Sequence, residues 1–242
     1  MKEYLYDPHV HTLETSHCGR IAAKTLVETY HEKGYAGFIV TDHLHETYIS
    51  SLDCHDDWDA CVDRFLLGYK TAKQRGAELG FGVLLGAELR FEQDSNNDYL
   101  VYGIDEAFLK RNPYPYRMDP HDFYQTFKNE VLIIHAHPFR EQHGLIRYDC
   151  VHGIEYINCS PRHENGNDQA LALCIENPHL LRTCSSDTHR PGDEGRAAMV
   201  FDTRLSDSFD YKRAVQQRAY RVHSEEFQHL IAKCNAYFGG RN

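Results

Sequence analysis

The chain has 242 residues, a hydrophobic fraction of 41% and a formal net charge of −10 at pH 7. The length is compatible with one large α/β domain or two small ones, and we expect a single domain over residues 1–242 because no linker divides the chain. The hydrophobic fraction argues against a disordered chain. The acidic balance argues against a long nucleic acid as partner, because such a partner is bound by a basic surface.

The N-terminal segment lacks the apolar core of a signal peptide, and no apolar run approaches membrane-spanning length. We therefore expect a cytoplasmic protein without a membrane partner. The eight cysteines include no Cys-x-x-Cys pair, so we expect them to be reduced thiols. The sequence does not indicate an oligomeric state.

A His-x-His pair, His9 and His11, follows a short predicted strand at residues 4–6. Residues two apart in an extended chain point to the same side, so both imidazoles could converge on one metal ion. Taken alone, such a pair is equally compatible with two solvated surface histidines. His17 follows in a predicted loop.

A helix is predicted over residues 21–33, because apolar residues recur there at helical spacing and a glycine follows as a C-cap. The next predicted strand, residues 37–40, runs into Thr41-Asp42-His43. The remaining predicted elements are a polar loop at 44–57, a helix at 58–79, strands at 83–88 and 98–105, a helix at 120–128, strands at 131–134 and 153–158, a helix at 167–176, strands at 180–184 and 197–201, and helices at 208–222 and 225–237.

Strands that alternate with helices predict a parallel sheet with right-handed crossovers. Roughly seven such units favour a distorted (β/α)7 TIM-like barrel of mostly parallel strands, with the helices near 208–237 packed on it. The C-terminal ends of parallel strands share one mouth of a barrel. Side chains that suit metal ions follow most of the predicted strands, namely His9, His11, His43, Glu88, His137, Asp187 and His189. Their convergence predicts a polynuclear metal site.

The same residues carry a family resemblance. The set His9-x-His11, His17, Thr41-Asp42-His43, Glu88, Ala136-His137-Pro138 and Ser186-Asp187-Thr188-His189 resembles the PHP family, named for polymerase and histidinol phosphatase. The resemblance runs from residue 7 to residue 189 in the order of the family. It implies a distorted seven-stranded barrel, histidinol-phosphatase-like chemistry and a cluster of two or three divalent metal ions.

The resemblance also implies a ligand set. One metal is held by His9, His11, Glu88 and Asp187, and Glu88 bridges to a second metal that His137 holds. His17, His43 and His189 correspond to a third site. In many family members the second metal has a further His beside the strand that follows the bridging Glu, and Asp98 is expected to take that place here.

Four other polar residues are expected close to the metals. Asp42 would orient an imidazole through its second nitrogen. His135 lies two residues before His137 and is therefore expected on the same side of the strand. Because the motif that resembles the family is Ala-His-Pro, His135 is expected to support a ligand, contact the substrate or protonate the leaving group. Glu155 and Asn158 lie on a strand that ends at the site, and a structural hydrogen bond is as compatible with them as substrate contact.

Clustered divalent metals can lower the pKa of a bound water and hold the resulting hydroxide in line with a phosphorus atom. Phosphate ester hydrolysis is therefore the expected reaction, with metal-bound hydroxide as nucleophile. Arg140, Arg190 and Arg20 are expected to grip a phosphoryl oxygen, although each could instead form a surface ion pair. The His and carboxylate ligands accept zinc, manganese or iron, so the sequence leaves the metal open.

The leading hypothesis is a metal-dependent phosphomonoesterase that acts on a small phosphorylated metabolite. The alternatives are a phosphodiesterase or 3′ exonuclease acting on nucleotides or short nucleic acid, and a non-catalytic metal-binding module. The loops at 44–57, 112–122 and 140–150 are expected to determine the substrate, and the sequence does not identify it.

Overall fold

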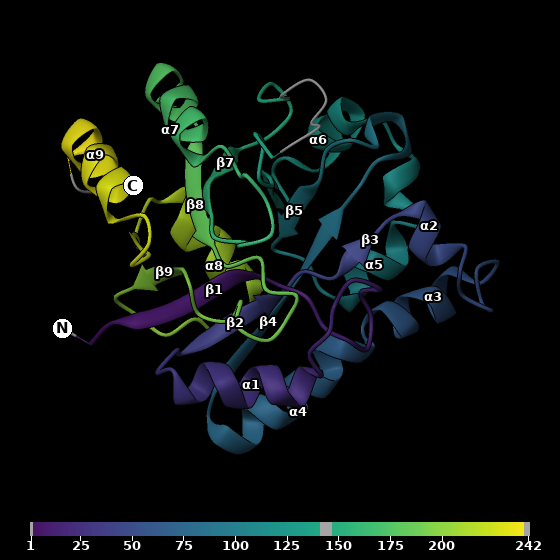
Figure 1. Cartoon of the computed structure of the whole chain (residues 1–242). Helices are drawn as coiled ribbons and strands as arrows, with labels where there is room; N and C mark the ends of the chain where they lie inside the picture. Colours follow the sequence, from purple (N-terminus) through teal and green to yellow (C-terminus); the bar gives the residue numbers. More distant parts are fainter. Residues whose placement is uncertain (1, 141–146, 240–242) are drawn as a thin grey trace.

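The computed structural model describes residues 2–140 and 147–239. One mixed β-sheet curls into a nearly closed barrel, and helices lie along its outer face (Figure 1). The strands are β1 (Tyr4–Val10), β2 (Gly37–Val40), β3 (His43–Leu44), β4 (Gly82–Leu89), β5 (Tyr99–Tyr102), β6 (Leu132–His135), β7 (Gly153–Asn158), β8 (Leu181–Ser185), β9 (Ala198–Phe201) and β10 (Arg221–His223). The α-helices are α1 (Ala23–Glu32), α2 (Glu46–Ile49), α3 (Trp58–Phe65), α4 (Leu67–Leu79), α5 (Glu106–Arg111), α6 (Pro120–Phe127), α7 (Asn167–Glu176), α8 (Ser208–Gln216) and α9 (Gln228–Phe238).

The strand order is β10-β9-β1-β2-β4-β5-β6-β7-β8, with β3 paired to β4. Strands β1 to β4 and β6 to β8 run in one direction. Strands β5 and β9 are antiparallel to both of their neighbours, and β10 is antiparallel to β9. The prediction of an α/β barrel is confirmed. The predicted count of seven strands is wrong, because the described residues form ten.

The reversed direction of β5 follows from the short connection before it. A parallel crossover requires about a dozen or more residues, and only residues 90–98 separate β4 from β5. The chain therefore turns back as an antiparallel pair, in which Glu88 lies opposite Leu100. As a result, the start of β5 lies at the mouth of the barrel, and Asp98 stands just before it.

The barrel closes at the same mouth. Val10 and Thr188 form a parallel bridge that joins the end of β1 to the segment after β8. The backbone N–H of His11 donates to Thr188 O at 3.0 Å, and the Thr188 N–H donates to His9 O at 3.1 Å. This contact brings residues 9–11 next to residues 187–189.

Alternation along the strands determines which side chains enter the barrel. On β4, Leu85 and Ala87 pack outward in the cluster that also contains residues of α3, α5 and α6. Leu84 belongs to the cluster that contains Ile39, Leu100 and Leu132 from neighbouring strands. Glu88 shares the parity of Leu84, so it points inward.

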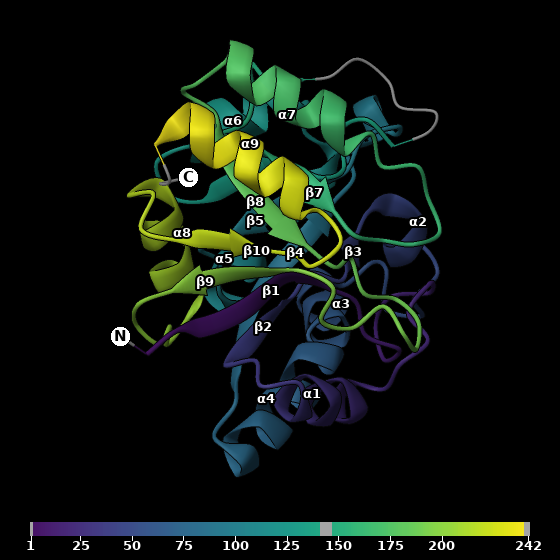
Figure 2. The same ribbon diagram turned by 60° about the vertical axis from the view of Figure 1, so that its left-hand side comes forward.

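Two pairs of helices cover different parts of the sheet. Helices α1 and α4 lie side by side against β2 and β4, and α7 and α9 lie beyond β7 and β8 (Figures 1 and 2). The predicted helix at 58–79 is divided, because α3 ends at Phe65 and α4 begins at Leu67. The predicted helix at 208–222 is too long, because α8 stops at Gln216 and β10 follows as a strand on β9. No helix within the described ranges is long and apolar enough to cross a membrane.

The N-terminal turn of α4 packs very closely against the loop after β1. A Cβ on Gly68 would overlap the Thr12 hydroxyl and approach Asp42 Oδ2 to 3.0 Å. The absence of a side chain at this position therefore lets α4 approach the loop that leads from His11.

We predict that Gly68→Ala lowers the free energy of unfolding by about 1–3 kcal/mol. Alanine improves helix propensity by at most about 1 kcal/mol, which is less than the cost of the steric overlap. Urea unfolding measures the difference. Gln74→Ala, at an exposed position of the same helix, should change stability by less than about 0.5 kcal/mol. A Gly68→Ala protein as stable as wild type would contradict the close contact.

Candidate metal centre

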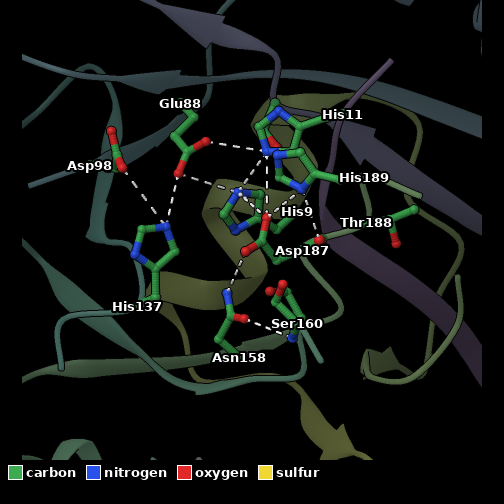
Figure 3. A network of polar contacts seen from close by, with 12 residues as sticks. His9, His11, Glu88, Asp98, His137, Asn158, Ser160, Asp187, Thr188 and His189 are labelled. Atoms are coloured by element: carbon green, nitrogen blue, oxygen red, sulfur yellow. Dashed lines mark hydrogen bonds and ion pairs between the residues drawn. The ribbon is translucent and has the colours of Figure 1, made fainter. Parts of the chain in front are cut away.

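Imidazole and carboxylate groups from five parts of the barrel meet at its mouth (Figure 3). His9 lies in β1, His43 begins β3 and Glu88 lies near the end of β4. The others follow strands: His11 comes after β1, His137 after β6, and Asp187 and His189 after β8. The structure therefore brings together seven of the residues that the sequence analysis selects as ligands.

Ligand atoms of four residues lie close together at the centre of this group. His9 Nε2 lies 3.0 Å from His11 Nε2, 3.4 Å from Glu88 Oε1 and 3.5 Å from Asp187 Oδ1. His11 Nε2 lies 3.2 Å from Glu88 Oε2 and 3.6 Å from Asp187 Oδ1. Ligands about 2.1 Å from a tetrahedral ion are about 3.4 Å apart. The spacing therefore fits a divalent metal.

Hydrogen bonding does not account for this arrangement. Glu88 Oε2 and Asp187 Oδ1 are buried, and neither accepts a well-oriented hydrogen bond from any described residue. Imidazole nitrogens nevertheless lie 2.8 to 3.6 Å from these oxygens. Buried carboxylate oxygens are normally hydrogen-bonded or bind a metal. These two atoms therefore fit a metal site.

Glu88 is positioned to serve more than one metal. Its Oε1 lies 3.1 Å from His137 Nε2, and its Oε2 lies 2.8 Å from His43 Nδ1. Asp98 Oδ2 is 4.0 Å from His137 Nε2, on the side where a replacement ligand is expected. However, Arg90 also holds Asp98 through two hydrogen bonds of 2.7 Å. The Asp98 carboxylate is thus shared between the predicted second metal position and an arginine.

Glu155 orients His9 and so prepares its other nitrogen for a metal. Glu155 Oε1 lies 3.0 Å from His9 Nδ1 and also accepts a hydrogen bond from Ser185. Its Oε2 accepts from the backbone of His137 at 2.8 Å and from Asn158 Nδ2 at 2.9 Å. A His9 that donates from Nδ1 presents an unprotonated Nε2 to the centre.

Asp42 acts on His11 through a serine that the sequence analysis did not select. Ser16 Oγ donates to Asp42 Oδ1 at 2.7 Å, so it can accept a hydrogen bond from His11 Nδ1 at 3.1 Å. The Thr12 backbone and hydroxyl also donate to Asp42, at 2.7 and 2.6 Å. This chain of bonds leaves His11 Nε2 free for a metal.

Backbone irregularities place several of these residues. Register shifts occur between Asp7 and Val10 on β1, and between Glu155 and Ile157 on β7. Bulges of this kind re-aim a side chain and are common beside active sites. His137 and Asp187 have φ values of 29° and 51°, which are costly for residues other than glycine. Strain thus accompanies two of the residues that face the metal centre.

His135 does not reach the mouth of the barrel. It is fully buried, its ring stacks on Tyr99 at a centroid distance of 5.2 Å, and its Nε2 lies 3.2 Å from Asn97 Oδ1. The alternation that was expected to put His135 and His137 on one side fails, because β6 ends at His135 and His137 has a positive φ. Its burial argues against direct contact with substrate.

Cys18, and not His17, joins His43 and His189. His17 is exposed, with its ring against Tyr48 and its Nε2 3.4 Å from Ser51 Oγ. Four residues each offer one ligand atom, and these atoms lie within 4.8 Å of one another: His11, Cys18, His43 and His189. The structure therefore places Cys18, and not His17, beside the other two residues of the expected third site.

A cavity of about 820 Å³ opens above the metal centre. Its lining includes His43, Glu88, Asp98, His137, Asp187 and His189, together with Cys18, His163 and the arginines Arg90, Arg140, Arg162 and Arg190. Arg20 is exposed and is not part of the lining. Of the expected substrate loops, residues 141–146 lie outside the described residues.

The arginines of the cavity differ in their partners. Arg140 donates to Asp187, to Asn158 Oδ1 at 3.1 Å and to Asn165 Oδ1 at 3.0 Å. Arg162 pairs with Asp193. The guanidinium of Arg190 makes no hydrogen bond or ion pair with the residues that the structure describes. Arg140 therefore holds Asp187 and Asn158 in place, whereas Arg190 is available to a ligand.

The charges of the centre shift the pKa values of its groups. Burial raises the pKa of Glu88, but His43 and His9 reverse this and leave the pKa well below 4.5. Burial lowers the pKa of His9, yet Asp187 and Glu88 bring it well above 6.5. Burial and the neighbouring His189 hold the pKa of His11 well below 6.5, so this imidazole is neutral at pH 7.

Neighbouring groups also shift the pKa values of His189 and Cys18, in the outer part of the centre. Burial lowers the pKa of His189, but Asp187 raises it to about 9. Burial raises the pKa of the Cys18 thiol, and hydrogen bonding to His189 and His43 outweighs this and lowers it to about 6. In the metal-free protein, protons therefore occupy positions that a cation would take.

A family model described as the PHP domain matches residues 7–240. A search of curated proteins found no significant match.

Similar folds occur among solved structures. A two-domain protein from Bacteroides vulgatus containing a predicted PHP-like metal-dependent phosphoesterase has a TM-score of 0.65 and 14% identity, covering 96% of this chain and 70% of that one. PsfC from Pseudomonas syringae has a TM-score of 0.64 and 16% identity, covering 98% of both chains. A lesion-specific endonuclease from Pyrococcus furiosus has a TM-score of 0.60 and 14% identity, covering 89% of this chain and 56% of that one. At these identities the likeness shows the fold alone.

We predict that divalent metal binds more tightly as the pH rises from 6 to 9. A metal must displace the protons held by His9 and His189, whose pKa values are raised, the latter to about 9. Affinity should therefore increase by about 10-fold per pH unit for each displaced proton. Competition with a chromophoric chelator measures this dependence. An affinity that does not change across this range would contradict the assignment of these imidazoles as ligands.

Proposed function

The chain belongs to the PHP domain family, and on this premise we propose that it is a phosphomonoesterase acting on a small phosphorylated metabolite. Its catalytic centre would hold two or three divalent metal ions. The observation that carries the proposal is the cavity of about 820 Å³ that six of the predicted ligands and four arginines line.

The cavity suits a small anion. Its volume falls within the range of about 300–1,000 Å³ that is usual for small-molecule sites. The whole chain carries a formal charge of −10, and three of the four arginines that line the cavity are paired with carboxylates. Positive charge for an anionic ligand would therefore come from Arg190 and from the metal ions, which favours a compact phosphorylated ligand over a long polyanion.

The residues at the mouth of the barrel could hold more than one metal ion. His9, His11, Glu88 and Asp187 would hold one ion, and Glu88 would share a second with His137 and Asp98. Such ions would neutralise charge on the phosphoryl oxygens and lower the pKa of the attacking water.

Other residues of the chain orient the expected metal ligands. The hydrogen bonds between His9 Nδ1 and Glu155 and between His11 Nδ1 and Ser16 determine which imidazole nitrogen of each histidine faces the centre. Arg140 and Asn158 fix Asp187, since both donate to its Oδ2. Arg190 would then grip a non-bridging phosphoryl oxygen with its planar donors.

A phosphodiesterase acting on nucleotides or short nucleic acid is the second candidate. The fold similarity to an endonuclease supports it. The negative charge of the chain and the bounded cavity favour the monoesterase. A metal-binding module without catalysis is a further alternative, and turnover of any phosphate ester separates it from both enzymes.

We expect wild-type protein loaded with zinc, manganese or iron to hydrolyse p-nitrophenyl phosphate faster than bis(p-nitrophenyl) phosphate. Removing one electrostatic contact to a transition state costs about 10²–10³-fold, so Glu88→Ala should lower kcat by at least about 10³-fold. Absorbance of released nitrophenolate measures both rates. Faster cleavage of the diester would favour the second candidate, and the absence of any turnover would favour the module.

We further expect Arg190→Ala to raise KM for the monoester by about 10-fold, since a charge-assisted hydrogen bond contributes about 1.5–3 kcal/mol. Arg190→Lys should recover part of this loss. Arg20→Ala is the matched control, because Arg20 is exposed outside the cavity, and its KM should equal that of wild type. Equal effects of the two alanine substitutions would refute the role of Arg190.

A further inference from the structure

We propose that Cys18 is a metal ligand, and that with His43 and His189 it forms a sulfur-containing metal position at the rim of the centre. This inference rests on the proposed function insofar as it assumes a metal-dependent enzyme. It assigns to Cys18 the place that the family resemblance gives to His17. A thiolate at this place would change which metal the position selects.

The first argument is the grouping of ligand atoms. Cys18, His43 and His189 come from the loop after β1, the start of β3 and the segment after β8, and their ligand atoms lie within 4.8 Å of one another and of His11. Cys18 is within hydrogen-bonding reach of both His43 and His189. All three residues line the cavity. Three protein ligands are the number that a catalytic zinc site uses when its fourth position is left to water or substrate.

The second argument is that His11 is already committed elsewhere. Its Nε2 faces Glu88 and Asp187, and its Nδ1 contacts Ser16. Its ring stacks on that of His189 with centroids 4.0 Å apart. His11 therefore separates the inner position from an outer one, which is left to Cys18, His43 and His189.

The third argument is that the loop holds Cys18 in place. Ser16 N–H donates to Thr12 O, and Gly19 N–H donates to Ser16 O, both at 3.0 Å. A Cβ on Gly19 would lie 2.5 Å from Thr12 O, so this turn is closely packed. The Arg20 N–H donates to His189 O at 2.7 Å, which ties the far end of the loop to the next ligand.

The same turn removes His17 from the site. Ser16 and Cys18 point toward the centre, as their contacts with His11 and His189 show, whereas the intervening His17 is exposed. Its imidazole contacts Tyr48 and Ser51 on the outside of the loop. The turn therefore directs Cys18, and not His17, toward His43 and His189.

A cysteine ligand gives the position a different metal preference. Thiolate sulfur suits zinc, whereas manganese and magnesium prefer carboxylate and water oxygen. The rim position should therefore take zinc in preference to manganese, while the inner ligands, which are imidazoles and carboxylates, accept either. The centre would hold zinc at its rim even when manganese is supplied in excess.

Cobalt(II) provides the test, because a thiolate ligand gives cobalt an intense near-ultraviolet charge-transfer band that imidazole and carboxylate ligands do not give. We expect cobalt-loaded wild type to show the band and Cys18→Ser to lose it. His17→Ala should retain it, and so should Cys54→Ser, which alters the other partly exposed cysteine. Zinc X-ray absorption should in parallel show a Zn–S distance of about 2.3 Å in wild type.

The metal content gives a second measure. Removing a residue that only orients a metal ligand typically lowers metal affinity by about 10–100-fold. Loss of the ligand itself should cost more, so we expect Cys18→Ser to weaken zinc binding at one position by at least about 100-fold. Thermal unfolding confirms that the variant is folded. A band that survives in Cys18→Ser, or disappears in His17→Ala, would overturn the proposal.

These outcomes are independent of the catalytic proposal. A charge-transfer band without hydrolysis of any phosphate ester would leave the sulfur ligand established and refute the phosphoesterase. Hydrolysis by a metal-loaded protein that shows no band would refute the sulfur ligand alone. If Cys18 instead acted as a nucleophile, Cys18→Ser would lose activity while keeping the metal content of wild type, and this result too would overturn the proposal.

Discussion

Two buried carboxylates, Glu88 and Asp187, are each 1% exposed and face a shell of imidazole nitrogens at 2.8 to 3.6 Å. Burying a charged group costs several kcal/mol unless another charge compensates it. In the metal-free protein the imidazoles supply that compensation by retaining protons, which raises the pKa of His9 and of His189. A divalent ion would supply it more completely. The arrangement of the barrel mouth follows from this requirement, because the strands must deliver enough ligands to one point to balance the two carboxylates.

The fold meets this requirement through closure and reversal of strands. The bridge between Val10 and Thr188 closes the barrel at the centre itself, so the histidines after β1 meet the Asp and His after β8. The reversed β5 places Asp98 at the mouth instead of the opposite end. Outer residues then fix the ligands: Glu155 orients His9, Ser16 orients His11, and Arg140 holds Asp187. Helix α4 supports this arrangement from outside, where Gly68 lets it approach Thr12 and Asp42.

Much of this could be predicted from the sequence, because strand ends and metal-ligating residue types are both visible there. The direction of β5 was predictable too, because residues 90–98 are too few for a parallel crossover. Two local features were not predictable. Hydrogen bonds of the turn decide whether residue 17 or 18 faces inward, and the positive φ of His137 ends the alternation that was used to place His135. Both depend on backbone conformation, which neighbouring residue types do not specify.

A crystal structure of the zinc-loaded protein, with anomalous diffraction recorded on both sides of the zinc edge, tests the central claim most directly. We predict an anomalous peak at each of three positions. The first lies between His9, His11, Glu88 and Asp187, the second lies beside Glu88 and His137, and the third lies between Cys18, His43 and His189. An absence of peaks at the mouth of the barrel under saturating zinc would contradict it, because the close approach of carboxylates and imidazoles would then have to be stable through protons alone.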